Sequence, residues 1–230
     1  MAVKLKLAKL LAAAVFVIAL PLLLFTFNLR LAINSLSLYE YGFNKNQVAS
    51  QTGLSPRELT RVAKGLIRYL NSSEEEISSD VFNPREKIHL RDVQGLVHLV
   101  NYVLLGSLAY ILGYLAWHLF RKGLHHFRNG LIRGCGLTLA IFLALGLGSL
   151  FGFDRLFLQF HLLSFSNSFW ILDPATDNLI VLFPPIFFYE AALFVIAATL
   201  FEAVLVGVVA WRWRPGGPGQ GKRQTVSGRS

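Results

Sequence analysis

The sequence predicts an all-α membrane protein with four transmembrane helices and a small, mainly helical extracytoplasmic cap. Three observations predict this class: four membrane-length apolar runs, a one-sided distribution of Lys and Arg, and a polar segment that carries helix-start signals. The predicted transmembrane helices are residues 10–30, 96–120, 134–153 and 186–211. At about 1.5 Å per residue, such runs approach the thickness of the hydrocarbon core, which is about 30 Å.

The first apolar run follows a short basic segment, residues 1–9, that contains Lys4, Lys6 and Lys9. A cleaved signal peptide also begins in this way. The uncharged run from Leu10 to Phe27 is too long for a typical signal peptide, and no clean cleavage site of small residues follows it. We therefore predict a first transmembrane helix with residues 1–9 as its cytoplasmic flank.

Basic residues are concentrated on one side of the predicted spans. The segments 1–9, 121–133 and 212–230 together hold twelve Lys and Arg and no acid, whereas the other ten basic residues are balanced by eleven acids. The positive-inside rule therefore places these three segments, and both termini, in the cytoplasm, and residues 31–95 and 154–185 outside. This bias explains most of the net charge of +9 without nucleic-acid binding. The tail, 212–230, is rich in Gly, Pro and basic residues and is predicted to be disordered.

The outer segment 31–95 contains one well-defined amphipathic helix. Ser55, Pro56 and Glu58 have the spacing of an N-cap, a first-turn proline and a capping-box acid. Apolar residues from Leu59 to Leu70 then recur at helical spacing, with basic residues away from them. The turn before this helix looks like that of a helix-turn-helix, but a place outside the cell argues against DNA binding. The basic face is expected to be solvated or to contact anionic lipid head groups.

A second helix start precedes the first candidate catalytic residue. Asn83, followed by a proline and by an acid at the third position, predicts a helix that continues through the second span to Phe120. His89 is then expected about two turns outside the bilayer core. Glu86 and Asp92 lie three residues to either side of it, where they could orient its ring or hold it charged.

The segment 154–185 is predicted to be a loop that carries a second histidine, His161. Its many aromatic residues fit an interfacial belt that anchors the loop among lipid head groups. Such a belt does not explain the polar residues Asn167 and Asp173, because polar groups in an apolar layer need partners or a substrate. Trp170 lies between these two residues. Both histidines are therefore expected at the outer membrane edge and at similar depth.

Other polar residues have simpler expected roles. The single Cys135 is expected to be a packing residue, and it excludes an intramolecular disulfide. His98 and Asn101 are expected to bond to neighbouring helices. Glu202 lies past the middle of the last span, where it could be functional or could make a helix–helix hydrogen bond; the sequence leaves both open.

Two blocks of residues carry a family resemblance: Glu86, His89 and Asp92-Val93, then Phe160-His161, Asn167, Trp170, Leu172-Asp173-Pro174 and Asp177. They resemble the four-span bacterial membrane proteins that include the lipoprotein intramolecular transacylase, over most of residues 10–210. Acids that often follow the family's Asn and its final Pro are replaced here by Ser168 and Pro185.

The resemblance implies an activity and a location. It implies transfer of the sn-2 acyl chain of an S-diacylglyceryl cysteine to the lipoprotein's own N-terminal amine, which gives the lyso form. His89 and His161 would be the catalytic histidines, and no cofactor is expected. The implied partners are diacylated lipoproteins and membrane lipid, with the active site at the outer leaflet of the bacterial plasma membrane.

The chemistry of two histidines fits this activity. An N-terminal ammonium must lose a proton before it attacks an ester, and a neutral imidazole is a suitable base. One histidine can take that proton while the other donates to the leaving glycerol oxygen. Because the attacking amine belongs to the substrate, no enzyme nucleophile is needed, and the sequence has no G-x-S-x-G motif. Asn167 and Trp170 are candidates for stabilising the oxyanion.

Two other functions remain open. Both histidines together with Asp92 or Asp173 could bind a divalent metal, as in a metal-dependent membrane hydrolase or a metal sensor. The H-E-x-x-H motif is absent, so we expect no metal. The chain could also be a non-enzymatic membrane protein that binds lipoproteins through its outer segment.

Overall fold

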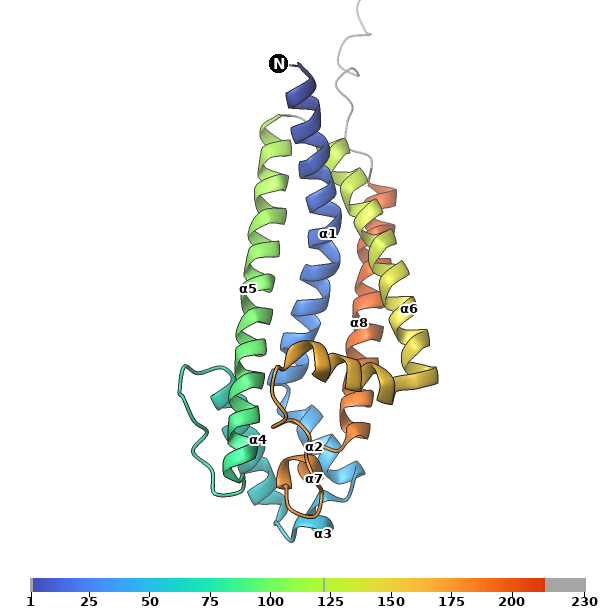
Figure 1. Cartoon of the computed structure of the whole chain (residues 1–230). Coiled ribbons are helices and arrows are strands. Elements are labelled where there is room, and N and C mark those ends of the chain that lie inside the picture. The colour runs from blue at the N-terminus through green and yellow to red at the C-terminus, as the bar shows by residue number, and fades with distance from the viewer. Residues whose placement is uncertain (1, 122, 214–230) are drawn as a thin grey trace, which may run out of the picture.

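The computed structural model describes residues 2–121 and 123–213, and these residues form helices and connecting segments without strands (Figure 1). Four long helices make a bundle: α1 (Ala2–Asn34), α5 (Pro84–Phe120), α6 (Leu124–Ser164) and α8 (Pro185–Arg212). Four short helices lie at one end of it: α2 (Leu36–Lys45), α3 (Val48–Thr52), α4 (Pro56–Leu70) and α7 (Asn178–Leu182).

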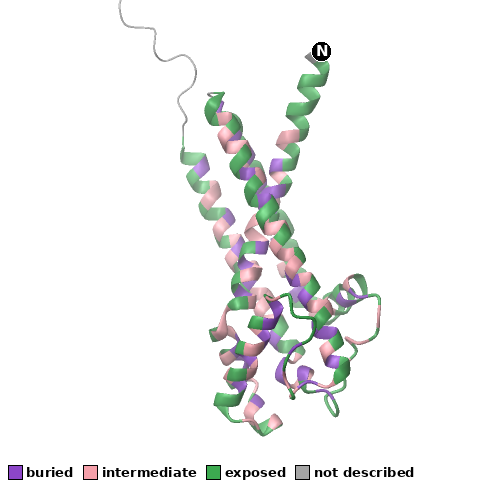
Figure 2. Cartoon of the chain, turned by 90° about the vertical axis from the view of Figure 1, so that its left-hand side faces the viewer, coloured by how far each residue is buried: buried purple, intermediate pink, exposed green. Residues whose placement is uncertain are grey.

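Each of the four long helices is long and apolar enough to cross a membrane. The predicted all-α membrane fold with four spans is therefore confirmed. Exposed residues cover much of these helices (Figure 2), and many of them are apolar, among them Leu105, Leu147 and Phe201. Lipid tails are as apolar as these side chains, so a bilayer is the solvent that such a surface needs.

Helix α1 packs against α5, α6 and α8. Its contact with α6 is close because two glycines face it. A Cβ atom at Gly130 would lie 2.8 Å from the Phe16 ring, and one at Gly134 would lie 2.8 Å from Leu20. Small residues let helices approach in a membrane, where packing rather than water drives their association.

The short helices form an end cluster, by which we mean α2, α3, α4, α7 and the connecting residues that share their core. Buried residues of this core include Phe43, Leu66, Leu182 and Phe183. The capping box predicted at Ser55 is present and begins α4. The apolar face of α4 packs into the end cluster, so it is covered by protein rather than by lipid.

Helix α6 is interrupted at Gly152, whose backbone is not helical (φ −169°, ψ 47°). We call residues 153–164, which follow this kink, the crossing segment. It turns away from the bundle axis and runs across the bundle from α8 toward α5 (Figure 1). Phe153 contacts Tyr189 of α8, with ring centroids 5.1 Å apart, and Phe157 contacts Phe188 at 5.3 Å.

The crossing segment corrects one expectation, since the loop predicted for residues 154–185 is helical up to Ser164. Asp154 and Arg155 end the apolar run in the sequence, and they look like the start of a loop. A helix can nevertheless continue through such charged residues when a kink turns it across the bundle. The long helices also extend beyond the predicted spans, because α1 reaches Asn34 and α6 begins at Leu124.

The N-terminus and the described end of α8 lie at the bundle end opposite to the end cluster (Figure 1). This arrangement fits the predicted topology, but the side of the membrane on which each end lies remains a prediction from the charges. The tail predicted to be disordered, residues 212–230, lies outside the described residues except for Arg212 and Trp213.

Candidate active site

The structure places the two predicted histidines beside each other. His89 comes from the second turn of α5, and His161 comes from the crossing segment. Their ring centroids are 6.2 Å apart, and the ring planes are inclined by 31°. Both are buried, with 7% of His89 and 8% of His161 exposed. This pair, which we call the histidine pair, forms where the bundle meets the end cluster.

Aromatic side chains surround the pair. The Phe165 ring lies 5.0 Å from His89 and 5.6 Å from His161, centroid to centroid. Trp170 lies 5.0 Å from His161, and Phe157 lies 4.4 Å from it. These rings keep water away from the imidazoles and so lower the local dielectric constant, which strengthens electrostatic effects on any reacting group.

The hydrogen bond of His161 fixes its tautomer. Its Nδ1 lies 2.7 Å from the carbonyl oxygen of Phe157, one helical turn earlier. A carbonyl oxygen can only accept, so Nδ1 carries the proton and donates it. In the neutral ring, Nε2 then presents a lone pair, which is the state that a general base requires.

His89 has a different environment. It lies before the predicted span that starts at residue 96, and its Nδ1 is buried without a hydrogen-bond partner among the described residues. Burial lowers its pKa to about 4, and the neighbouring His161 acts in the same direction, against the opposing charge of Asp92. The ring is therefore neutral near pH 7, and a buried nitrogen without a partner is left for a substrate atom.

Two polar contacts fasten the aromatic loop, residues 165–173, onto α5. Asn167 donates its amide N–H to Asp92 Oδ2 at 2.8 Å and accepts the N–H of Phe169 at 3.1 Å. Arg85 donates from Nη2 to the carbonyl oxygens of Ser168, at 3.0 Å, and Ile171, at 2.6 Å. Both contacts hold Phe165 and Trp170 over the pair.

These contacts refine the predicted roles of Asp92 and Asn167. The spacing of Asp92 predicts that it orients the His89 ring or holds it charged. Its bond to Asn167 makes it an anchor for the loop, and its charge also acts on His89. Sequence reasoning missed Arg85. An arginine in the first turn of a helix has no distinctive spacing, so only the folded loop reveals its partners.

Glu86 does not orient His89, although their spacing suggested that it could. Its carboxylate is fully buried and accepts the backbone N–H of Asn83, at 2.6 Å, and the N–H of Leu179. Burial raises its pKa, against the lowering effect of these two hydrogen bonds. The capping box turns the side chain back toward the helix start, away from the following turn that carries His89. Glu86 thus joins α5 to α7.

Asp173 shapes the turn before α7 instead of contacting the pair. Its Oδ1 accepts the N–H of Ala175 at 2.9 Å, and its own N–H donates to Asp177 Oδ2 at 2.7 Å. Asp177 in turn accepts the Asn83 side chain at 2.7 Å. Asp173 therefore supports the site from the end cluster.

No three His, Cys, Asp or Glu side chains gather closely enough to hold a metal ion in residues 2–121 and 123–213. Asp92 and Asp173, the carboxylates considered as ligands, have the hydrogen-bond partners described above.

Outside the site, Glu202 makes the helix–helix contact that was one of its two expected roles. Its Oε2 accepts the Asn28 amide at 2.7 Å, from α1. His98 contacts the Ser72 carbonyl at 3.0 Å through Nε2, and Asn101 accepts from Arg30. Cys135 is buried against the α6–α8 contact, 3.4 Å from the Cβ position at Gly207.

Comparisons with known proteins identify one family and one fold. The family model described as "Lipoprotein intramolecular transacylase Lit" matches residues 14–188. A structure of the membrane-integral lipoprotein intramolecular transacylase Lit from Bacillus cereus superposes with a TM-score of 0.79 and 22% identity, covering 89% of this chain and 94% of that one. A variant of the same protein, with one histidine replaced by alanine, gives a TM-score of 0.77 and 21% identity over 92% and 96% of the two chains. No curated protein sequence matches.

Proposed function

The chain belongs to the lipoprotein intramolecular transacylase family, and from this premise we propose that it converts diacylated lipoproteins to their lyso form. The proposed reaction moves the sn-2 acyl chain of the S-diacylglyceryl cysteine to the N-terminal amine of the same lipoprotein. The observation that carries the proposal is the buried histidine pair, His89 and His161, with ring centroids 6.2 Å apart.

The reaction balances without an added reagent. The amine nitrogen attacks the ester carbonyl carbon, a C–N bond forms, and the C–O bond to glycerol breaks. One proton leaves the nitrogen, and one is delivered to the glycerol oxygen. His161 offers an Nε2 lone pair and His89 offers an unpartnered Nδ1, so the two rings can share these transfers.

The surroundings of the pair favour transfer over hydrolysis. Phe157, Phe165 and Trp170 cover the imidazoles, and a site with little water gives the amine an advantage over water as the nucleophile. Amine and ester belong to one substrate, so the enzyme gains most from holding them in an attack geometry. Trp170 is our candidate contact to the oxyanion, and Asn167 positions the loop.

The proposed location of the site is the outer leaflet of the plasma membrane, with both termini in the cytoplasm. The Lys and Arg bias supports this topology, and the start of α5 and the crossing segment, which carry the pair, lie away from the N-terminal end of the bundle (Figure 1). A cysteine at Ser79, in the end cluster, should react with an impermeant thiol reagent in intact cells, in a chain whose own Cys135 is replaced. Protection there, with labelling of an Arg121→Cys chain instead, would reverse the topology.

A synthetic diacylglyceryl lipopeptide tests the reaction itself. Incubated with the purified full-length protein, it should keep its mass and lose its reactive amine, and prior chelator treatment of the protein should make no difference. Mass spectrometry separates this outcome from hydrolysis, which makes the peptide lighter by one acyl group. An unchanged amine with tight binding of the peptide would point to a binding protein instead.

A further inference from the structure

Three long helices bring basic side chains together where α5 ends and α6 begins, at the bundle end that also contains the N-terminus (Figure 1). His118 comes from the last turn of α5 and His126 from the first turn of α6. Their ring centroids are 5.6 Å apart. Lys9 of α1 is close enough for its charge to act on His126. We call these three residues the basic junction.

Other basic groups surround the basic junction. His125 is exposed, and its ring centroid lies 3.9 Å from that of His126. The Arg121 guanidinium lies over the Trp117 ring, 4.7 Å from its centroid. Arg128 donates to two backbone carbonyl oxygens at the end of α8, at 2.9 and 3.0 Å. The titratable side chains at this place are therefore positively charged or can become so.

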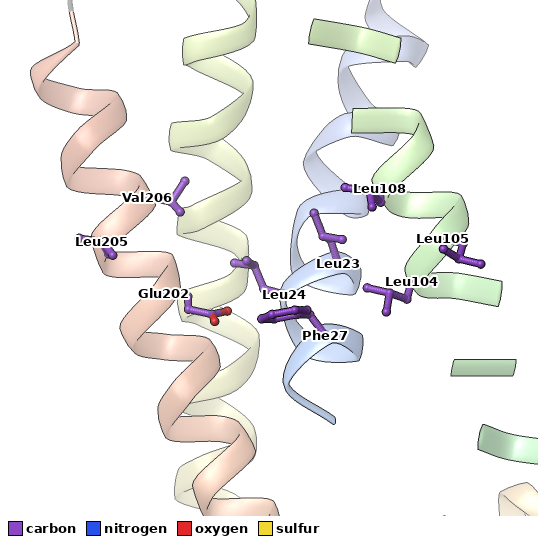
Figure 3. Close-up of a pocket in the computed structure, with 9 residues that line it drawn as sticks. All are labelled: Leu23, Leu24, Phe27, Leu104, Leu105, Leu108, Glu202, Leu205 and Val206. Carbon is purple, nitrogen blue, oxygen red and sulfur yellow. The ribbon is translucent and has the colours of Figure 1, made fainter. Parts of the chain in front are cut away.

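The helices that form the basic junction offer it no acid. Residues 1–39, 93–153 and 203–230 contain no Asp or Glu. On α8, the acid closest to this end is Glu202, which points toward α1 (Figure 3) and accepts the Asn28 amide at 2.7 Å. None of the three junction residues forms an ion pair in the part of the chain that the structure describes. Like charges this close repel one another, so a counter-ion must come from another molecule.

The basic junction also has an open side. Gly123 lies just before α6, and a Cβ atom there would lie 3.1 Å from His118 Nδ1 and 3.7 Å from His126 Cδ2. The side of Gly123 that carries no side chain therefore faces both rings. Gly123 is also the N-cap of α6 and makes no side-chain cap hydrogen bond, so the positive end of the helix dipole adds to the attraction for an anion.

We propose that the basic junction binds the phosphate group of an anionic membrane phospholipid. Phe120 and Trp117, in the last turn of α5, are 88% and 56% exposed, as expected where a helix leaves the hydrocarbon and meets the head groups. A phospholipid covers such apolar surface with its chains while its phosphate meets the basic residues, and free phosphate does not. Basic pockets between transmembrane helices bind head groups of this kind. The site lies apart from the histidine pair and takes no part in the proposed reaction.

Protonation of the two histidines is coupled to this binding. A phosphate offsets the repulsion among Lys9, His118 and His126, so it binds more tightly when the rings are charged. An imidazole ordinarily titrates at about pH 6.5. The affinity for the lipid should therefore rise as the pH falls from 8 to 6, and the complex should take up protons as it forms.

Native mass spectrometry of the purified full-length protein tests the site with defined lipids. From micelles that contain equal amounts of phosphatidylglycerol and phosphatidylcholine, the wild type should retain the anionic lipid preferentially at pH 6. Lys9→Gln should lower this retention about fivefold, because one basic residue near an anionic head group contributes at this scale. Lys4→Gln is the matched control. Lys4 is an exposed lysine of the same helix that points about 140° away from Lys9, so its variant should bind as the wild type does.

The histidines are tested by the pH dependence. A chain with both His118→Gln and His126→Gln should lose the rise in retention between pH 8 and pH 6, whereas Lys9→Gln should keep it. The two lysine variants decide alone if the histidine variant does not fold, as judged by circular dichroism. Equal retention of the two lipids by the wild type, or equal losses in the two lysine variants, would overturn the site. Displacement of the lipid by inorganic phosphate would make free phosphate the ligand and overturn the assignment to a lipid.

Discussion

The helix bundle and the end cluster bury apolar side chains in opposite ways. In the bundle, many of the largest apolar side chains, such as Leu147 and Phe201, point outward, and close contacts rely on small residues such as Gly130 and Gly134. In the end cluster, apolar side chains such as Leu182 point inward, as in a water-soluble domain. The difference arises because the bundle is packed for contact with lipid, whereas the end cluster is packed as proteins are in water.

The histidine pair lies on the boundary between these regions. His89 comes from a bundle helix at the point where it enters the end cluster, and His161 comes from the crossing segment. An acyl ester of a membrane lipid also lies at such a boundary, with its chain in the hydrocarbon and its head in water. The proposed reaction therefore fits this boundary, where the lipid-facing packing of the bundle gives way to the buried core of the end cluster.

The largest expected effect comes from removing the groups on the boundary. His89→Ala and His161→Ala should each lower turnover of the synthetic lipopeptide about a thousandfold, because general acid–base catalysis contributes at this scale. The double variant should be little worse than either single one, since residues that act as a unit are not additive. As a control, His125→Ala changes an exposed residue in the first turn of α6, 36 residues before His161 along the chain, and should retain full turnover. Near-normal turnover by either single variant would remove the pair from the mechanism.

A comparison of two leucines tests the two packing modes directly. Leu182→Ala removes a side chain that is 1% exposed in the end cluster, and should lower the free energy of unfolding by about 2–5 kcal/mol. Leu147→Ala removes one that is 57% exposed toward lipid, and should change it by less than about 0.5 kcal/mol. Unfolding in mixed micelles, followed by circular dichroism, measures both. Equal losses would mean that Leu147 packs against protein.

The contacts that fasten the aromatic loop to α5 should affect rate more than stability. Arg85→Ala removes two hydrogen bonds from a charged donor to the loop, and the resulting displacement of Phe165 and Trp170 should lower kcat about tenfold. Lys87→Ala is the matched control, since it breaks an exposed ion pair with Glu76, 2.9 Å long, without touching the loop. Faster proteolysis at residues 165–173 should accompany the loss in Arg85→Ala only. An unchanged kcat in this variant would show that the loop needs no such fastening.

The smallest expected effect is a pH dependence of stability caused by His89. Its pKa falls from an ordinary value near 6.5 to about 4 on folding, so between these values the unfolded chain binds more protons than the folded one. Stability therefore rises with pH across this window and is lost as pH falls from about 6.5 toward 4. The loss of Tm between pH 7.5 and pH 4.5 should be smaller in His89→Gln than in the wild type. Equal losses of Tm in the two proteins would show that another group causes the pH dependence.

The two regions also differ in how far the sequence predicts them. The four spans follow from composition, because a bilayer sorts residues by a property that each residue carries by itself. The helices that begin at Ser55 and Asn83 follow from local capping signals. The crossing segment was not predictable in this way, because whether a helix stops or bends at Gly152 depends on the contacts of Phe153 and Phe157 with α8.

Within the site, the sequence predicted that the two histidines lie at one membrane edge, and the structure places them together, whereas the partners of other side chains could not be predicted. His89 and His161 were identified from their place beside the spans and from the family resemblance, and the structure brings them together. Leu179, the distant partner of Glu86, and Ser168, a partner of Arg85, lie 93 and 83 residues away along the chain. Helical spacing cannot reveal such pairs, because it reports only on neighbours within one element.

The buried carboxylate of Glu86 also imposes an order on how the protein is made. Asn83, one of its partners, is three residues away, and the other, Leu179, is synthesised 93 residues later. Until Leu179 emerges, the start of α5 contains an acid with half of its bonds unmade, which is costly to bury. His89 therefore reaches its final setting only after most of the chain has left the ribosome. We therefore expect a nascent chain with only its first three spans inserted to lack the contact that joins α5 to α7.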